Sequence, residues 1–212
     1  MHIDIYSDPV CPWCLIGKRR LEKALTALPD TEITIAWRPF QLHPHLPREG
    51  ADRGEFTAAK FGSAEAATAT YERVRGVGAE EGLDLRFDLI KRSPNTVDAH
   101  RLLTYAAREG KQDDVVEGLF ADFFFNGFDV SDHDVLVATA EKAGLDGDVV
   151  RAYLATDEDR DAVEQSDEQA RSMGVQGVPF FVIDDKYALS GAQPAEMFIQ
   201  AFEQIETEAA VD

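Results

Sequence analysis

Long apolar runs are missing from this sequence. The longest apolar stretches, such as residues 178–183 (VPFFVI), are far shorter than the roughly 20 residues that a helix needs to cross a bilayer. The first residues, MHIDI, contain neither a basic segment nor an apolar run followed by a small-residue cleavage site, which are the marks of a secretory signal. We therefore expect no membrane span and a cytoplasmic protein.

Basic residues are also scarce. The 212 residues include 21 Lys and Arg against 40 Asp and Glu, which gives a formal net charge of -19. Such a charge repels phosphate backbones and anionic lipids, so neither nucleic acid nor a membrane surface is an expected partner. The acids are spread along the chain, as in halophilic proteins of acidic proteomes, where salt screens the self-repulsion. The composition therefore predicts a stability that falls as salt is removed.

The first forty residues predict a strand, a helix and a second strand. Residues 3–6 alternate between apolar and polar side chains and are followed by a Ser-Asp-Pro stop. Apolar residues then recur at helical spacing over 12–28, and residues 32–40 are again rich in strand formers. Two strands joined in this way form a right-handed parallel crossover.

The middle of the chain predicts mainly helices. Residues 43–50 are rich in Pro and Gly and predict an exit from the first unit. Apolar periodicity and helix-start patterns such as Asn95-x-x-Asp98 and Ser131-x-x-Asp134 then predict helices over 63–81, 95–109, 113–125, 131–143, 148–155 and 157–173. The only candidate strand is 83–87. Because no internal repeat is visible, residues 43–174 are predicted to form a helical insertion domain.

The last forty residues return to a β pattern. Residues 180–183 and 187–189 flank a turn and predict a hairpin, after which Pro194 opens a final helix. The β-α-β and β-β-α ends together predict an α/β fold in which helices cover a four-stranded mixed sheet. That sheet domain would comprise residues 1–42 and 175–212, and the length fits one domain carrying a large insertion.

The only two cysteines, Cys11 and Cys14, stand three residues apart in Cys-Pro-Trp-Cys. The motif lies between the first strand and the first helical turn, where free N–H groups and the helix dipole favour an anion. Cys11 can keep its sulfur exposed there as a thiolate, and Cys14 lies one turn further on. We therefore predict that Cys11 is the nucleophile of a thiol-disulfide exchange and Cys14 the resolving thiol.

Two other uses of the cysteines are weaker. A structural zinc site needs four ligands, and none of the five histidines has a spacing that ties it to the cysteines, so no metal is expected. The histidines are His2, His43, His45, His100 and His133. A purely structural disulfide across so short a loop would add little stability in a reducing compartment.

Several motifs together resemble a known family. The Cys11–Cys14 motif, the long helical insertion and Gly177-Val178-Pro179 before Phe180 resemble the DsbA-like thioredoxin-fold oxidoreductases, in particular the FrnE-like branch. Residues 38–42 (RPFQL), 93–96 (SPNT) and 99–101 (AHR) are similar to that branch as well. The resemblance covers essentially the whole chain. It differs from periplasmic DsbA in having no leader and in having Trp13 where DsbA has a histidine.

The resemblance implies a thioredoxin fold and a protein-disulfide oxidoreductase that acts on thiol- or disulfide-bearing proteins or small molecules. It implies that Cys11 and Cys14 are the redox pair and that Pro179 follows a cis peptide bond. The Val178 backbone would then pair with a substrate chain like an added strand. The residues expected to contact substrate are Pro12, Trp13, Val178, Pro179, Asn95 and His100.

Two alternatives remain open. The same superfamily includes 2-hydroxychromene-2-carboxylate isomerases and kappa-class glutathione transferases, which use glutathione without cycling a disulfide, and here glutathione would be a co-substrate. The presence of Cys14 weighs against them, because a lone nucleophile suffices there. Asn95, His100 and Arg101 could line a small-molecule pocket in either case, or be ordinary residues of a capped helix. The third class is a non-catalytic binding protein on the same fold. Apart from glutathione, no cofactor is expected.

Overall fold

The computed structural model describes residues 1–29 and 31–209 and contains a four-stranded mixed sheet. The strands are β1 (His2–Ser7), β2 (Thr34–Pro39), β5 (Phe180–Ile183) and β6 (Tyr187–Ser190), in the order β2-β1-β5-β6. β1 pairs with β2 in parallel and with β5 antiparallel, and β5 and β6 form the expected hairpin. The predicted α/β fold with a mixed sheet is confirmed.

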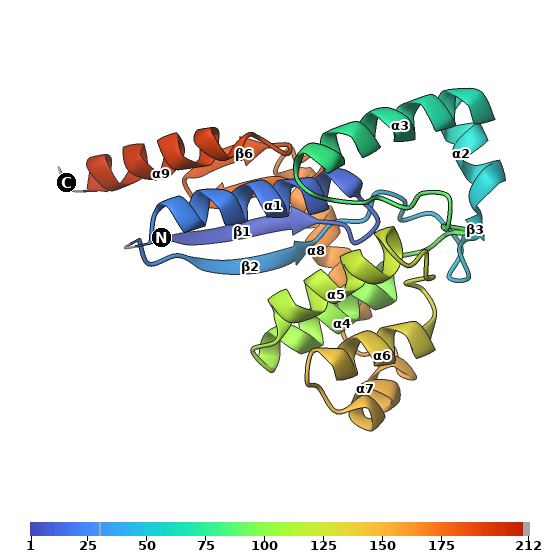
Figure 1. Cartoon of the computed structure of the whole chain (residues 1–212). Coiled ribbons are helices and arrows are strands. Elements are labelled where there is room, and N and C mark those ends of the chain that lie inside the picture. The colour runs from blue at the N-terminus through green and yellow to red at the C-terminus, as the bar shows by residue number, and fades with distance from the viewer. Residues whose placement is uncertain (30, 210–212) are drawn as a thin grey trace.

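Helices cover both faces of this sheet (Figure 1). Side chains alternate along β1, so Ile3 and Ile5 point into the main core with α1 (Pro12–Ala27) and α9 (Ala195–Ala209). Tyr6 points to the opposite face, where it packs on a small cluster that includes Phe40 and Ala170. Ala170 belongs to α8 (Arg160–Ser172), which therefore covers the second face.

The segment between β2 and α8 is mainly helical. Its helices are α2 (Arg53–Phe61), α3 (Ala64–Glu80), α4 (Val97–Arg108), α5 (Gln112–Phe124), α6 (His133–Lys142) and α7 (Gly147–Leu154). Two short antiparallel strands, β3 (Ala51–Asp52) and β4 (Arg92–Ser93), hold the start of α2 against the start of α4. Buried residues of α3 to α7 and of the sheet form one continuous hydrophobic cluster, so the two parts share a core.

The predicted strand at 83–87 is wrong. Leu83 and Leu85 are buried, which explains the alternating pattern, but they pack against helices and not within a sheet. The Leu83 N–H donates to the Gly78 carbonyl at the end of α3, and the Arg86 N–H donates to the Phe124 carbonyl. An alternating pattern indicates an extended segment with one buried side. It does not require that the segment pair with another strand.

Two elements were not predicted, namely α2 and the β3–β4 pair. The start of α2 has a local signal, because the Asp52 carboxylate accepts from the Glu55 N–H, and Gly62 ends the helix in the left-handed conformation. The predicted starts of two other helices are shifted. α4 begins at Val97 with no side-chain cap, since Asn95 forms a turn before it, and α6 is capped by Asp132.

Among residues 1–29 and 31–209, no helix combines the length and apolar character that crossing a bilayer requires.

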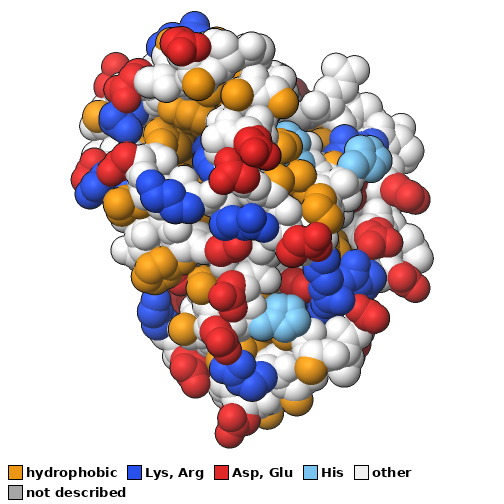
Figure 2. All heavy atoms as spheres, turned by 90° about the vertical axis from the view of Figure 1, so that its right-hand side faces the viewer, with side chains coloured by type: hydrophobic (Ala, Val, Ile, Leu, Met, Phe, Trp, Pro, Cys, Tyr) orange, Lys and Arg blue, Asp and Glu red, His pale blue; other side chains and the backbone are white. Residues whose placement is uncertain are grey.

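On the face in Figure 2, acidic and basic side chains are interspersed and do not form separate fields. Ion pairs also tie elements together: α1 carries the buried Lys18, which pairs with Asp113 and Glu117 of α5. Burial opposes the charge of Lys18, but these carboxylates and Glu22 raise its pKa.

Candidate active site

Cys11 begins α1 just after strand β1 ends. Its N–H donates to the Asp8 carbonyl with an N···O distance of 2.9 Å, which closes a turn between strand and helix. Cys11 is the N-cap residue, with extended backbone (φ -93°, ψ 111°), and no side chain caps the helix. Pro12 lies in the first turn, where an N–H would lack an intrahelical partner. The Cys11 sulfur therefore lies at the positive end of the helix dipole, which favours an anion.

Cys14 lies one turn further along α1, and both thiols are free. Burial raises the pKa of the Cys14 thiol well above its usual value, and a hydrogen bond with the Cys11 side chain raises it further. Smaller effects of the Ser7 side chain and the Asp8 backbone oppose this rise. The two cysteines are thus within hydrogen-bonding reach of each other, and Cys14 is held as a protonated thiol.

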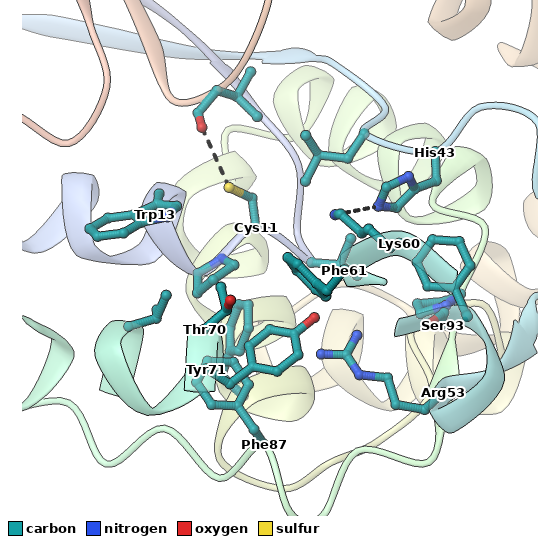
Figure 3. A pocket seen from close by; sticks show the side chains of 18 of the residues that line it. Cys11, Trp13, His43, Arg53, Lys60, Phe61, Thr70, Tyr71, Phe87 and Ser93 are labelled. Atoms are coloured by element: carbon teal, nitrogen blue, oxygen red, sulfur yellow. Dashed lines mark hydrogen bonds between the residues drawn. The ribbon is translucent and has the colours of Figure 1, made fainter. Parts of the chain in front are cut away.

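The Cys11 sulfur is less exposed than the sequence suggests. The residue is only 3% exposed, because the segment before β5 folds over it. The Cys11 thiol donates to the Val178 carbonyl with an S···O distance of 3.5 Å, across 167 positions of sequence (Figure 3). The Val178–Pro179 peptide bond is cis. Gly17 of α1 lets the segment that contains Pro179 pack against the helix, since a Cβ at position 17 would lie 2.9 Å from Pro179 Cγ.

Cys11 lines a cavity of about 280 Å³. Pro12, Trp13 and Val178 line it beside Cys11, and Trp13 is 41% exposed. The remaining wall comes from α2, α3, β4, the end of α5 and the segments that follow β2 and α3 (Figure 3). The wall is largely aromatic and includes Phe56, Phe61, Tyr71, Phe87 and Phe124.

Polar residues that were not predicted also line the cavity, namely His43, Arg53, Lys60 and Ser93. Lys60 Nζ lies 3.0 Å from His43 Nε2. Burial, with smaller contributions from the charges of Lys60 and Arg53, lowers the pKa of His43 to about 4, so the ring is neutral at pH 7 and accepts from Lys60. Three of these residues lie on or before α2, the helix that was not predicted, and no spacing linked them to the cysteines.

Asn95 and His100 do not line this cavity. The Asn95 amide donates to the Leu46 carbonyl at 2.7 Å and accepts from the Val97 N–H, so it fixes the turn before α4. His100 is 1% exposed, and burial lowers its pKa to about 4. Its Nε2 lies 3.9 Å from Asp8 Oδ1, and neither ring nitrogen has a hydrogen-bond partner within the described part of the chain.

Arg101, next to His100, is fully buried and has a structural role. Its guanidinium donates to carbonyls near the end of α7, including those of Tyr153 and Thr156, and pairs with Asp98 at 2.8 Å. These carbonyls lack intrahelical partners, so Arg101 closes the end of α7 against α4.

Asp8 is a buried carboxyl group directly before the cysteine motif. Burial raises its pKa to about 7, although N–H groups of Leu42 and Val10 donate to it. The Leu42 bond is the shorter, at 2.7 Å. Asp8 therefore holds its proton to a much higher pH than an ordinary aspartate does. Within residues 1–29 and 31–209, no group of three His, Cys, Asp or Glu side chains is placed to hold a metal ion.

Comparisons with known proteins cover nearly the whole chain. The family model of the DSBA-like thioredoxin domain matches residues 2–203. The crystal structure of SCO1869 from Streptomyces coelicolor, described as a probable DsbA oxidoreductase, is similar, with a TM-score of 0.89 and 38% identity over 98% of this chain and 91% of that one. The uncharacterized protein YwbO of Bacillus subtilis is 27% identical over 205 residues, 95% of either chain.

A 2-hydroxychromene-2-carboxylate isomerase has the same fold. Its structure is similar with a TM-score of 0.74 over 99% of this chain and 98% of that one, at 16% identity. At this identity the likeness extends to the fold alone. The fold by itself therefore does not assign a reaction to this chain.

Proposed function

Because the chain belongs to the family of DSBA-like thioredoxin domains, we propose that Cys11 and Cys14 exchange a dithiol for a disulfide with thiol or disulfide groups of proteins or small molecules. The observation that carries this proposal is the position of the two thiols. Cys11 lies at the start of α1, in the wall of an open cavity, within reach of both Cys14 and the Val178 carbonyl.

The exchange proceeds in two steps. The Cys11 thiolate, favoured by the helix dipole, attacks one sulfur of a substrate disulfide, which forms a mixed disulfide and releases one thiolate. Cys14 then loses its proton and attacks the Cys11 sulfur, which closes the Cys11–Cys14 disulfide and releases the second thiolate. The two protons of the enzyme thiols end on the two released thiolates. Substrate oxidation is the reverse sequence.

Burial supports this division of roles. The raised pKa of Cys14 keeps it protonated and unreactive until a mixed disulfide forms beside it. The Val178 carbonyl, which accepts from the Cys11 thiol in this state, is free to accept from a substrate once that thiol has lost its proton. We further propose that the protein works in the cytoplasm, in the FrnE-like branch of its family, and in a halophilic setting.

The second candidate is a glutathione-dependent isomerase or transferase. The aromatic cavity beside Cys11 favours it, since its size suits a small molecule better than a protein chain. Cys14 weighs against it, because that chemistry has no use for a resolving thiol. A protein that only binds ligands on the same fold is the remaining alternative.

Turbidimetric reduction of insulin by dithiothreitol tests the proposal on the full chain. We expect catalysis by the unmodified protein, and a fall to the uncatalysed rate in both Cys11→Ser and Cys14→Ser, with circular dichroism verifying that both variants fold. Activity kept in Cys14→Ser, together with glutathione-dependent turnover of an aromatic substrate, would instead support the isomerase. No acceleration by the unmodified protein in either assay would leave binding as its function.

A further inference from the structure

The cavity beside Cys11 contains two cationic side chains that have no carboxylate partner among the described residues. Most lysines and arginines of this acidic chain pair with a carboxylate, but within residues 1–29 and 31–209 neither Arg53 nor Lys60 lies within 4.0 Å of one. Both line the same cavity. A net charge of -19 makes carboxylates abundant. Two neighbouring cations that lack a carboxylate partner therefore indicate that a ligand supplies the anion.

Arg53 begins α2, and its guanidinium lies over the Tyr71 ring, 4.8 Å from the ring centroid. No hydrogen bond of this side chain is formed within the described residues, although a guanidinium carries five donors. Burial lowers the pKa of Arg53, which reflects the cost of holding its charge away from water. A carboxylate would accept two of these donors side by side and relieve that cost.

Lys60 approaches the cavity from the last turn of α2 (Figure 3). Its ammonium donates to the neutral His43 ring, which leaves two further N–H groups for a ligand. Burial lowers the pKa of Lys60, while the thiolate form of Cys11 and the carboxylate form of Asp8 act on that pKa in the opposite direction. Lys60 thus lines the same cavity as Cys11.

Ser93 contributes a third polar group without a partner. Its hydroxyl is buried and forms no hydrogen bond within the described residues, and the residue is 3% exposed and lines the same cavity. β4 pairs with β3 next to the start of α2, which holds Ser93 beside Arg53. Buried hydroxyl groups are normally hydrogen-bonded, so the unpartnered Ser93 hydroxyl indicates that a polar atom of a ligand binds there.

The rest of the wall is apolar. Phe56, Phe61, Tyr71 and Phe87 line the same cavity as Arg53 and Cys11, and aromatic rings favour a flat apolar body. Resting on the proposed function, we propose that the small-molecule substrates of this protein are aromatic disulfides bearing a carboxylate, with the carboxylate bound by Arg53, Lys60 and Ser93 and the sulfur presented to Cys11.

The reaction with such a disulfide balances without a further reactant. The Cys11 thiolate bonds to one substrate sulfur and expels the other half as an aromatic thiolate. Cys14 then displaces the second half and closes the enzyme disulfide. The substrate gains two electrons, the enzyme dithiol loses them, and the two enzyme protons are left to the aromatic thiolates or to water, according to pH.

Single-turnover stopped-flow kinetics on the reduced full chain test the proposal. The probes are 5,5′-dithiobis(2-nitrobenzoate), which is aromatic and carboxylated, 4,4′-dithiodipyridine, which is aromatic and uncharged, and glutathione disulfide, which is carboxylated but lacks rings. A charge-assisted hydrogen bond contributes about 1.5–3 kcal/mol. We therefore expect Arg53→Gln to slow the first probe about 10- to 100-fold and the second less than about twofold.

Arg151→Gln is the matched control, because it removes the same charge from an exposed site on α7. It should leave both rates within about twofold, whereas Lys60→Gln should slow the carboxylated probe selectively. Equal slowing of charged and uncharged probes, an equal effect of Arg151→Gln, or glutathione disulfide reacting faster than the aromatic carboxylate would overturn the proposal. If the uncharged probe still oxidises Cys11 and Cys14, the proposed exchange function survives that failure.

A binding measurement keeps the inference testable if no disulfide reacts. Calorimetric titration with 4-nitrobenzoate and with 4-nitrobenzamide compares a carboxylate with an uncharged group of similar shape. We expect the carboxylate to bind at least about tenfold more tightly, and Arg53→Gln to remove that preference. Equal binding of the two probes by the unmodified protein refutes a carboxylate subsite, whatever the redox activity.

Discussion

Asp8 offers a sharp test of how burial controls charge at the active site. The residue is fully buried, and burial raises its pKa from 3.8 to about 7. The N–H groups of Leu42 and Val10 and the Thr96 hydroxyl favour the charged form but do not offset the loss of water, and the charge of Asp167 adds to the rise. The folded protein therefore holds this proton more tightly than the unfolded chain does.

The sign and size of the effect follow from proton linkage. Between pH 3.8 and about 7 the folded state binds one proton more than the unfolded state at Asp8, so its contribution to stability is complete below pH 3.8 and is lost as pH rises to about 7. At about 1.4 kcal/mol per pH unit, the loss amounts to about 4 kcal/mol. Above pH 7 it no longer changes.

Asp8→Asn isolates this contribution, because the amide oxygen can still accept from the Leu42 N–H but cannot titrate. The stability curve of the unmodified protein alone does not isolate the contribution of Asp8. His43 and His100, with pKa values lowered to about 4, add stability as pH rises toward 6.5. The variant minus the unmodified protein cancels the part of those contributions that does not depend on Asp8. Asp161→Asn, an exposed carboxylate on α8, is the control for net charge.

Urea unfolding at fixed salt between pH 4 and pH 8 provides the measurement. We expect Asp8→Asn to gain stability relative to the unmodified protein steadily with pH, by about 4 kcal/mol in all, and Asp161→Asn to show no such trend. A difference that stays constant across this range would refute the reasoning, since it would mean that Asp8 does not change its charge there.

Three further predictions concern other parts of the fold. Gly17→Ala places a Cβ 2.9 Å from Pro179 Cγ, so the rate of insulin reduction should fall several-fold. The control Gly76→Ala, which lies in open space within α3, should keep its activity and gain about 0.5–1 kcal/mol of stability. Arg101→Met strips donors from the end of α7 and a partner from Asp98, and should cost about 3–5 kcal/mol in urea unfolding; a cost below about 1 kcal/mol would contradict this role. The melting temperature should fall from molar to millimolar KCl, and a flat or rising value would argue against charge repulsion.

The two ends of the chain were predictable because their signals are local. Alternation in β1 and β5, the stop before Cys11 and Pro12 at a helix start act over a few residues, and the structure has these elements where the pattern put them. The placement of Cys11 and Cys14 at a helix start follows from the same signals. Charge and composition likewise need no folding to be read.

Other features arose only when distant segments packed together. Leu83 and Leu85 alternate like a strand but lie against helices, and nothing nearby in sequence tells these cases apart. Burial of Asp8 under the segment that follows β2 raises its pKa, and this depends on a partner more than 30 positions away. The local sequence contains no trace of either effect.

The sequence by itself thus determined the strands of the mixed sheet and the chemistry available at the start of α1, since strand alternation, helix-start residues and cysteine spacing are properties of short segments. Only the tertiary structure decided what that chemistry faces. It brought Val178 to Cys11, left Asn95 and His100 outside the cavity, and gathered Arg53, Lys60 and the aromatic rings around the sulfur. Such a cavity depends on the relative position of helices that are far apart in the chain, and side-chain patterns along one segment do not specify that position.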